Sequence, residues 1–483
     1  MADKDFVYGA MSVPSAEASY RLIRWGWGGL NRKDVIDTGD ITDCDGVYIH
    51  PPYVDAAPAF SPVAQYAEAV GIYGFDDFLL VLYRQGGKIR CDFRRGDSVF
   101  SGIIGDASGT AADFAHRSVV QFNVAEGTEN IVSASFRRKL LIFPDRVSLD
   151  FEITESGFTA ASLGQAYPEI KYATVYGSRL FGVDDNLVYA SSYNDYADWD
   201  LDTADEVSDA NAWVSMSQSN AKADGAFTGI WTYDNHVVLF KRDFTQLVYN
   251  NKNPFRIVDV TAYGAVSQRA IAEAEGVLYF ASTDMVYAFT GGIPKAIGEE
   301  LDITDYRDAC LGSLRDCLYL SVSGMLYRYR DGVWSQVSLA VPIVQFAENE
   351  NGLYGLLSDG EIVLVDGDAL SGEDGVYGDW WFETDFMAAG RLDIRRAKKL
   401  SVLCEIAPGA SVSVYLLRNG EKFDAGTSLR VLSSSGHGWR TLSGLVRGMS
   451  ADFHRLRFAG HGKVRVHAAE LTIAWGGGLY QER

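Results

Sequence analysis

Residues 275–289 read EGVLYFASTDMVYAF, and residues 315–329, which start 40 positions later, read RDCLYLSVSGMLYRY. Each stretch opens on a polar or glycine turn, continues as an alternating apolar strand, turns again and ends in an aromatic-rich strand. This order is typical of a β-hairpin. The two stretches therefore predict two copies of one hairpin unit.

The hairpin unit recurs along most of the chain. Clear copies begin at residues 234, 275, 315 and 351, so successive starts are 41, 40 and 36 residues apart. This period matches the ~40–45 residues of a four-stranded propeller blade. Looser copies begin at residues 76, 137 and 178. We therefore predict an all-β fold with a seven-bladed β-propeller over residues 64–375; hairpins that pair into sandwiches are the alternative.

The looser copies are spaced less evenly than the clear ones. The starts at 76, 137, 178 and 234 are 61, 41 and 56 residues apart, so two blades need insertions. The Gly-, Ala- and Ser-rich residues 101–115 and the acidic residues 194–209 are the segments expected to fill them.

The two ends of the chain have a different texture. From about residue 376 the hairpins give way to longer alternating strands, such as SVSVYLLRNG at 411–420 and KVRVHAAELTIAW at 463–475. Alternation implies one buried and one wet face. We predict a jelly-roll-like C-terminal β-sandwich over residues 376–483. Residues 1–63 have weak periodicity and are predicted to be an extended N-terminal arm.

Apolar side chains in the arm and at the domain junction are the candidate assembly residues. The arm contains Trp25, Trp27 and Leu30, which together are too much apolar surface to leave in water. We expect the arm to dock on a neighbouring subunit or another protein; the competing outcome is that it packs within its own chain. At the junction, Trp380 and Trp381 are expected to pack between domains or subunits.

Composition and charge narrow the possible functions. The chain has 483 residues, 47% of them hydrophobic and 22% charged, which is ordinary globular usage. The formal charge of −21 argues against tight binding to nucleic acid or to anionic lipid. Five scattered cysteines indicate neither a disulfide framework nor a zinc site. The acidic start and the lack of a long apolar run predict a protein without a signal peptide or a membrane span.

No motif for catalysis or for a cofactor is evident. The sequence has no phosphate-binding loop, no metalloprotease histidine pair and no G-x-S-x-G elbow. Around Asp198, Asp200 and Asp202 the acidic segment is spaced roughly like a calcium loop, but Thr203 occupies the glycine position. We expect a solvated loop there. The prediction is therefore a protein that is not an enzyme and has no catalytic, cofactor-binding or metal-binding residues.

Several stretches are similar to one known group of proteins. Gly28-Gly29-Leu30-Asn31 precedes TDCDGVYIHPPYVDAAPAF at residues 42–60, and further echoes are LLIFPDRVSLDF at 140–151, SRLFGVDDNLVYASSYNDYADW at 178–199 and a long match at 253–301. These stretches resemble β-propeller virion proteins of bacteriophages, from the tail nozzle or the head-to-tail (neck) region. The resemblance covers roughly residues 28–300, and the C-terminal sandwich matches a domain appended in some relatives.

The resemblance implies a structural role. It implies a virion protein, made in the host cytoplasm, that contacts adaptor, tail or neck proteins and forms a homo-oligomeric ring, such as a hexamer, through which genomic DNA passes. An acidic lumen would let a polyanion slide past without sticking. The alternative is a carbohydrate-binding or glycan-active β-propeller, either a phage adhesin or a glycosidase.

Overall fold

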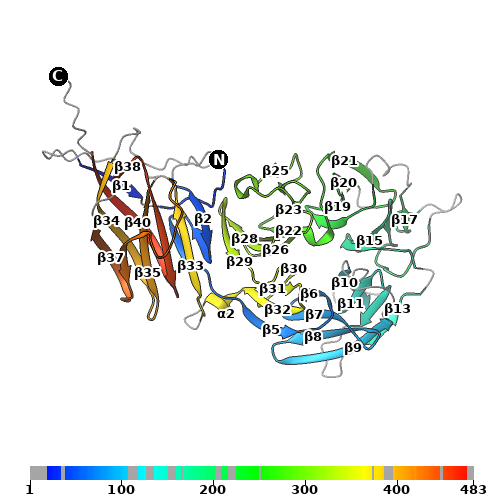
Figure 1. Ribbon diagram of the computed structural model, residues 1–483. Helices are drawn as coiled ribbons and strands as arrows, with labels where there is room; N and C mark the ends of the chain where they lie inside the picture. Colours follow the sequence, from blue (N-terminus) through cyan, green and yellow to red (C-terminus); the bar gives the residue numbers. More distant parts are fainter. Residues whose placement is uncertain are drawn as a thin grey trace, which may run out of the picture.

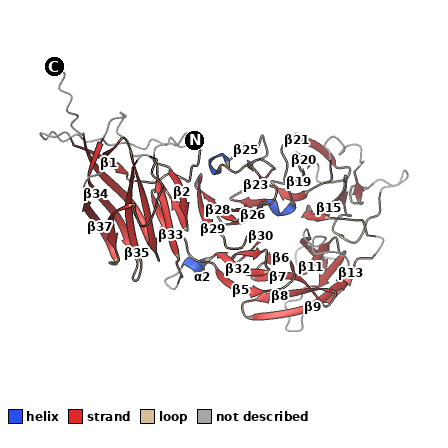
Figure 2. Ribbon diagram, viewed as in Figure 1, coloured by secondary structure: helices blue, strands red, loops and turns tan. Residues whose placement is uncertain are grey.

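The chain folds almost entirely into β-strands. The structure is a computed structural model. It describes residues 19–24, 26–33, 39–106, 117–126, 135–150, 159–164, 167–201, 208–215, 225–249, 252–371, 375–385, 395–418, 420–446 and 450–475. Strands dominate these residues (Figure 2), which confirms the predicted all-β class. A propeller of small sheets lies beside a unit of two larger sheets (Figure 1).

The small sheets in the described part of the chain number seven, each with four antiparallel strands. In the first four, the chain order is also the order across the sheet. Their strands are β6 (Ala69–Phe75), β7 (Phe78–Gln85), β8 (Lys88–Arg95) and β9 (Ser98–Asp106); β10 (Ser118–Glu126), β11 (Ser135–Phe143), β12 (Val147–Asp150) and β13 (Thr159–Ser162); β14 (Tyr172–Tyr176), β15 (Arg179–Asp184), β16 (Leu187–Ala190) and β17 (Trp213–Val214); and β18 (Gly229–Tyr233), β19 (His236–Lys241), β20 (Phe244–Tyr249) and β21 (Arg256–Thr261).

The last of the remaining three sheets takes one strand from far upstream. Strand β5 pairs with β32 and completes a sheet whose other strands come from the far end of the propeller. The strands of these sheets are β22 (Ile271–Ala274), β23 (Val277–Ala281), β24 (Val286–Phe289) and β25 (Lys295–Ala296); β26 (Cys310–Leu314), β27 (Cys317–Val322), β28 (Met325–Arg330) and β29 (Val333–Ser338); and β30 (Ile343–Asn349), β31 (Gly352–Leu357), β32 (Glu361–Asp366) and β5 (Ser61–Gln65).

Each hairpin predicted from the sequence is present as the two middle strands of one of these sheets. The turn before the second strand of a sheet places its polar residue at positive φ, as at Asp76 (47°), Asp234 (44°) and Glu275 (48°). Positive φ is the conformation that a tight hairpin turn requires. The middle strands are buried on both faces, as the continuous burial of β7 from Phe78 to Leu82 shows, because neighbouring sheets cover them.

The two expected insertions have different outcomes. Residues 101–106 belong to β9, so the prediction that the whole of 101–115 is an insertion is wrong; its end, residues 107–115, lies outside the described residues. Strand β9 continues to Asp106 because residues 98–106 pair with the neighbouring strand β8. The acidic residues 194–209 do lie in the long connection between β16 and β17, and residues 202–207 are outside the described residues.

Two larger sheets make up the two-sheet unit, and their inner faces share one core. In both, strands from the N-terminal region pair with strands from the C-terminal region. The seven-stranded sheet contains β3 (Val47–His50), β4 (Tyr53–Ala56), β40 (Val464–Trp475), β34 (Arg395–Ile406), β37 (Gly438–Leu445), β1 (Ser19–Arg24) and β38 (Ser450–Ala451). The five-stranded sheet contains β2 (Ile41–Asp45), β33 (Asp379–Thr384), β39 (His454–His461), β35 (Ser411–Arg418) and β36 (Leu429–Ser434).

The N-terminal strands correct one prediction. Strands β1, β3 and β4 belong to the same sheet as β40, and β2 pairs with β33. The prediction of a separate extended arm over residues 1–63 is therefore wrong for the strands that the structure describes. These strands are short, and β1, β2 and β4 find partners more than 300 residues away, so no local periodicity marks them.

Helices are few and short in the described ranges. There they are the helical turns η2 (Gln268–Ala270) and η3 (Glu299–Leu301) and the single turn α2 (Asp368–Ser371). None of the helices in the described ranges has the length and apolar character needed to cross a membrane.

Candidate functional site

A cavity of about 530 Å³ lies where the first strands of the seven small sheets meet. Residues of β6, β10, β14, β18, β22, β26 and β30 all line it. The cavity has the size of a pocket for a small molecule. It is therefore the first place to look for binding or catalysis, and its polar groups decide what it can do.

Two glutamine side chains in the cavity join one sheet to the next. Gln345 of β30 donates from Nε2 to the carbonyl of Ile72 at 2.7 Å and accepts the Ile72 N–H at 3.3 Å. Gln268 makes the same pair of bonds to Ile230, at 3.0 and 2.8 Å. Each amide thus satisfies both backbone groups of a residue on a neighbouring inner strand. We call these two contacts the glutamine clasps.

Hydroxyl groups make similar links between other inner strands. The Ser118 hydroxyl donates to the carbonyl of Ala173 at 3.1 Å and accepts the Ala173 N–H at 3.1 Å. The hydroxyls of Thr174 and Thr232 are 2.8 Å apart, and Thr232 also donates to the carbonyl of Val175 at 3.1 Å. The first strands of neighbouring sheets are thus held together by side chains within the cavity wall.

The two arginines of the cavity are also engaged by protein groups. Arg269 donates to the backbone carbonyls of Val344 at 3.2 Å and Val70 at 3.1 Å, and burial lowers the pKa of its guanidinium. Arg117 makes two bonds to the carboxylate of Asp145, at 2.5 and 2.9 Å. Both cations therefore tie strands together.

Two carboxylates in the cavity are the candidates for acid–base chemistry. Glu348 of β30 accepts a hydrogen bond from the Ser313 hydroxyl at 3.4 Å, and loss of hydration raises the pKa of its carboxyl. Glu273 of β22 accepts a bond from the Trp231 indole N–H at 3.4 Å. A carboxyl with a raised pKa can act as a general acid.

We expect Gln345→Leu to lower the free energy of unfolding by about 1–3 kcal/mol, because the N–H and carbonyl of Ile72 lose their buried partner. Chemical denaturation followed by tryptophan fluorescence measures the change. Gln121→Leu is the matched control, since among the described residues the Gln121 amide hydrogen-bonds only the side chain of Asn123, at 3.3 Å, and that bond is exposed. Equal stability of the two variants would mean that the clasp contributes nothing.

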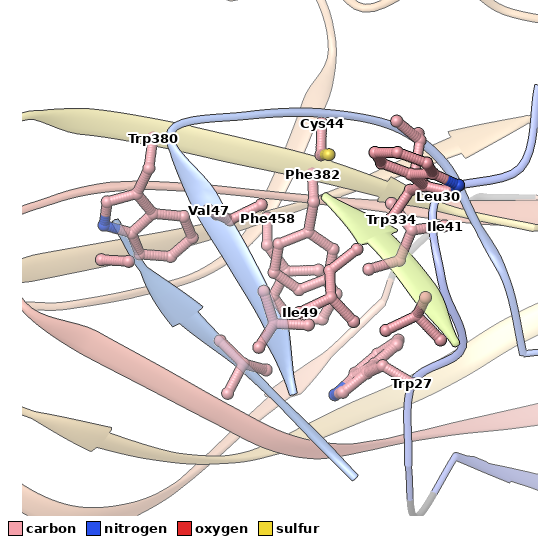
Figure 3. Close-up of a cluster of buried hydrophobic side chains, with 14 of the residues drawn as sticks. Trp27, Leu30, Ile41, Cys44, Val47, Ile49, Trp334, Trp380, Phe382 and Phe458 are labelled. Carbon is pink, nitrogen blue, oxygen red and sulfur yellow. The ribbon is translucent and has the colours of Figure 1, made fainter. Parts of the chain in front are cut away.

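The candidate assembly residues lie mainly at the seam between the propeller and the two-sheet unit. Trp27 is 1% exposed, and its ring meets Phe382 and Phe458 edge to face, with centroids 5.4 and 5.5 Å away (Figure 3). Leu30 is also 1% exposed, and its N–H donates to the carbonyl of Trp334 on β29 at 2.9 Å. The seam therefore joins the N-terminal region to both parts of the molecule.

Glycine is required where this segment passes the propeller. A Cβ on Gly29 would lie 2.9 Å from the Cβ of Val333, closer than such atoms approach in proteins. The N–H of Gly28 donates to the carbonyl of Gly39 at 2.7 Å, and that of Asn31 to the carbonyl of Ile41 at 2.9 Å. Gly28-Gly29-Leu30-Asn31, which carries part of the phage resemblance, thus has a structural role in packing.

The structure corrects two of the assembly predictions. Trp27 and Leu30 are buried within their own chain, which was the competing outcome, so the expectation that they dock on another subunit or protein is wrong. Trp380 is also buried within its own chain, which leaves packing inside the chain as the outcome for this residue. The physical reason is that strands β1–β4 and β33 enclose them in the core of the two-sheet unit (Figure 3). Trp381 is partly exposed, with the Arg457 guanidinium 3.8 Å above its ring, and remains a candidate. Trp25 lies outside the described residues.

The acidic segment uses its described carboxylates in turns and in an ion pair. Asp195 and Asp198 accept backbone N–H bonds from Ala197 at 2.8 Å and Asp200 at 3.0 Å, and Asp209 pairs with Lys252 at 2.5 Å. No group of three or more His, Cys, Asp or Glu side chains within the described ranges could hold a metal ion. Asp202, the third aspartate of the spacing that resembles a calcium loop, lies outside those ranges.

Comparisons with known proteins give structural matches only. No model of a protein family and no curated protein sequence matches the chain. Among solved structures, YCF48 bound to D1 peptide is 9% identical, with a TM-score of 0.40 over 67% of this chain and 98% of that chain. The WD40 domain of Toxoplasma gondii coronin is 12% identical, with a TM-score of 0.33 over 71% and 91%. An arabinoxylan arabinofuranohydrolase from Bacillus subtilis is 9% identical, with a TM-score of 0.22 over 84% and 95%.

Proposed function

We propose that this chain is a structural protein of a bacteriophage virion, a component of the tail or of the head-to-tail neck or nozzle that acts through assembly contacts and not as an enzyme. The observation that carries the proposal is the use of the central cavity. Its glutamines, hydroxyls and arginines hydrogen-bond neighbouring strands to one another, which suits a rigid building block. The sequence resemblance to phage propeller proteins supports the same role.

The finer architecture is part of this proposal. The seven small sheets are the seven blades of one ring, which β5 closes by joining the sheet of β30, β31 and β32. The two-sheet unit is a β-sandwich built from both ends of the chain. Closure by a strand from upstream would keep the ring from opening under load, because β5, which leads into the first blade, is held in the last blade by backbone hydrogen bonds to β32.

The cavity also bears on how DNA would pass. A space of about 530 Å³ fits a small molecule and is far too small for a duplex. A DNA conduit would therefore lie at the centre of an oligomer, such as a ring of six copies, with neighbouring tail, adaptor or neck proteins above and below it. The net charge of −21 would limit sticking of DNA to that conduit.

Detection of the protein in purified phage particles tests the proposal. We expect every particle to contain the same number of copies, and this number to be a multiple of the ring symmetry. Electron cryomicroscopy should show density for the propeller in the tail or neck. The proposal would be overturned if the gene is expressed in the host and the purified particles still lack the protein.

A second candidate function is the binding or hydrolysis of glycans, and the observation that favours it is the carboxylate pair. Glycosidases need two carboxyl groups, one of them with a raised pKa, and Glu273 and Glu348 line one cavity. We expect no hydrolysis of common polysaccharides by the purified protein under the leading proposal. Hydrolysis that Glu273→Gln and Glu348→Gln each abolish, with unchanged melting temperature, would replace it with this one.

A further inference from the structure

The charge of the chain is divided very unequally between its two parts. Residues 376–483 contain 15 Lys and Arg and 10 Asp and Glu, a formal charge of +5. Residues 1–375 contain 28 Lys and Arg and 54 Asp and Glu, which gives a formal charge of −26. Opposite net charges within one chain favour contacts in which the basic part of one copy meets the acidic part of another.

The basic part exposes apolar and cationic side chains together at one edge. On β36 and β37, Leu429, Trp439 and Leu445 are 38%, 60% and 74% exposed. Arg430 and Arg440 on the same strands are exposed and form no ion pair with a carboxylate in the described part of the chain. We call these five residues the β36–β37 edge. Tryptophan and arginine are the residue types most enriched where protein interfaces gain their affinity.

The acidic part has a matching surface in the connection between β16 and β17. Tyr193 and Leu201 are 52% and 49% exposed there. Asp195 and Asp200 are exposed beside them and pair with no cation among the described residues. We call these four residues the β16–β17 loop. Together the edge and the loop hold five of the eleven large hydrophobic side chains that the described part of the chain exposes.

The two surfaces cannot meet within one molecule. Strand β37 lies on the side of the two-sheet unit away from the propeller, and β17 lies on the side of the propeller away from the two-sheet unit (Figure 1). Contact between them therefore needs two copies in a head-to-tail arrangement. Such heterologous contacts close into a ring when the rotation between copies permits it.

We propose that the β36–β37 edge of one copy docks on the β16–β17 loop of the next. The apolar side chains of each surface cover those of the other, and Arg430 and Arg440 face Asp195 and Asp200. This inference rests on the proposed assembly role and names the contact that the ring would use.

Charge reversal on each surface tests the contact, with association measured by sedimentation velocity over a range of concentrations. We expect the natural chain to self-associate and to dissociate as salt rises from about 0.1 M to about 1 M, which shortens the Debye length from about 10 Å to about 3 Å. Arg430→Glu with Arg440→Glu, and separately Asp195→Lys with Asp200→Lys, should each weaken association at least about tenfold. All four substitutions in one chain should restore it, because each contact then pairs reversed charges.

The matched control is Lys295→Glu with Lys463→Glu, which changes the net charge by the same amount at exposed lysines outside both surfaces. Association of the edge variant equal to that of this control would overturn the inference, as would a natural chain that stays monomeric at low salt. Trp439→Ala that leaves association unchanged but removes binding of a glycan would also overturn it, because Trp439 would then serve glycan binding and not the contact between copies. Presence in virions is measured separately, so a failed contact in a protein that particles contain rejects the contact and leaves the proposed function standing.

Discussion

Trp27→Ala is expected to lower the free energy of unfolding by about 3–5 kcal/mol, the range for removing a large buried aromatic side chain. The indole is 1% exposed and meets Phe382 and Phe458 edge to face. The cavity left behind would lie in the largest core of the molecule, which continues from the two-sheet unit into the adjoining propeller sheets. Because the structure around it is tied to both parts, it can collapse only partly.

Denaturant titration of Trp27→Ala beside Trp439→Ala measures this effect. Trp439 is 60% exposed, so its removal should change the unfolding free energy by less than about 0.5 kcal/mol. Trp27→Phe should cost less than Trp27→Ala, since a ring is kept and the buried indole N–H, which has no hydrogen-bond partner among the described residues, is removed. Similar stability of Trp27→Ala and Trp439→Ala would show that the N-terminal segment packs elsewhere.

The propeller hairpins are the part of the fold that could be predicted best from the sequence, in contrast to the segment around Trp27. The propeller hairpins could be predicted because each is a local pattern, with a turn and two apolar strands that repeat at nearly constant spacing. Long C-terminal strands such as β35, whose burial alternates residue by residue, could be predicted for the same reason. In all of these, the residues that carry the signal are neighbours in the chain.

The N-terminal strands could not be predicted in this way. Strand β1 pairs residue for residue with β40, so that Leu22 lies opposite Leu471. A strand of four to six residues has too few positions to show a period, and nothing in its own sequence specifies a partner so far along the chain. The apolar content of the segment was evident from Trp27 and Leu30, but not whether its own chain or another would cover it.

The candidate site was missed for a related reason. Gln268 lies in the helical turn η2 and Gln345 in strand β30, and neither belongs to a recognisable motif. Only the arrangement of the sheets around the cavity brings each of them next to the first strand of a neighbouring sheet. For Gln345, its place in the largely apolar strand β30 is the one signal that could have suggested a buried polar link.

A buried ion pair fastens the N-terminal segment at a second point. Arg24, at the end of β1, donates to both carboxylate oxygens of Asp385, which follows β33, with the longer of the two bonds at 2.7 Å. Both side chains are 7% exposed. Burial raises the pKa of Asp385 to about 6, against the attraction of Arg24, which lowers it. The loss of hydration is thus the stronger effect, and the carboxylate is held charged at neutral pH at a cost in free energy.

The sign of the pH dependence follows from that raised pKa. The folded chain keeps the Asp385 proton at a higher pH than the unfolded chain, whose carboxyl has an ordinary pKa of 3.8. Between these two values the folded state binds more protons, so the stability contributed by this group falls as the pH rises through about 4 to 6. Asp385→Asn should remove this part of the pH dependence, which denaturant titrations at several pH values would reveal.

Arg24→Leu is expected to cost about 3–5 kcal/mol at pH 8, because it leaves the ionised Asp385 buried without its cation. The cost should be smaller at pH 5, since that pH lies below the pKa of Asp385 and the carboxyl is then mostly protonated in the folded state. Arg21→Leu on the same strand is the control: Arg21 is 55% exposed and 3.5 Å from Glu470, so its loss should cost less than about 1 kcal/mol at either pH. Leucine at both Arg24 and Asp385 should regain stability over Arg24→Leu, because no buried charge then remains. A cost of Arg24→Leu that is the same at pH 5 and pH 8 would mean that packing of the arginine stem, and not the charge of Asp385, holds β1 in place.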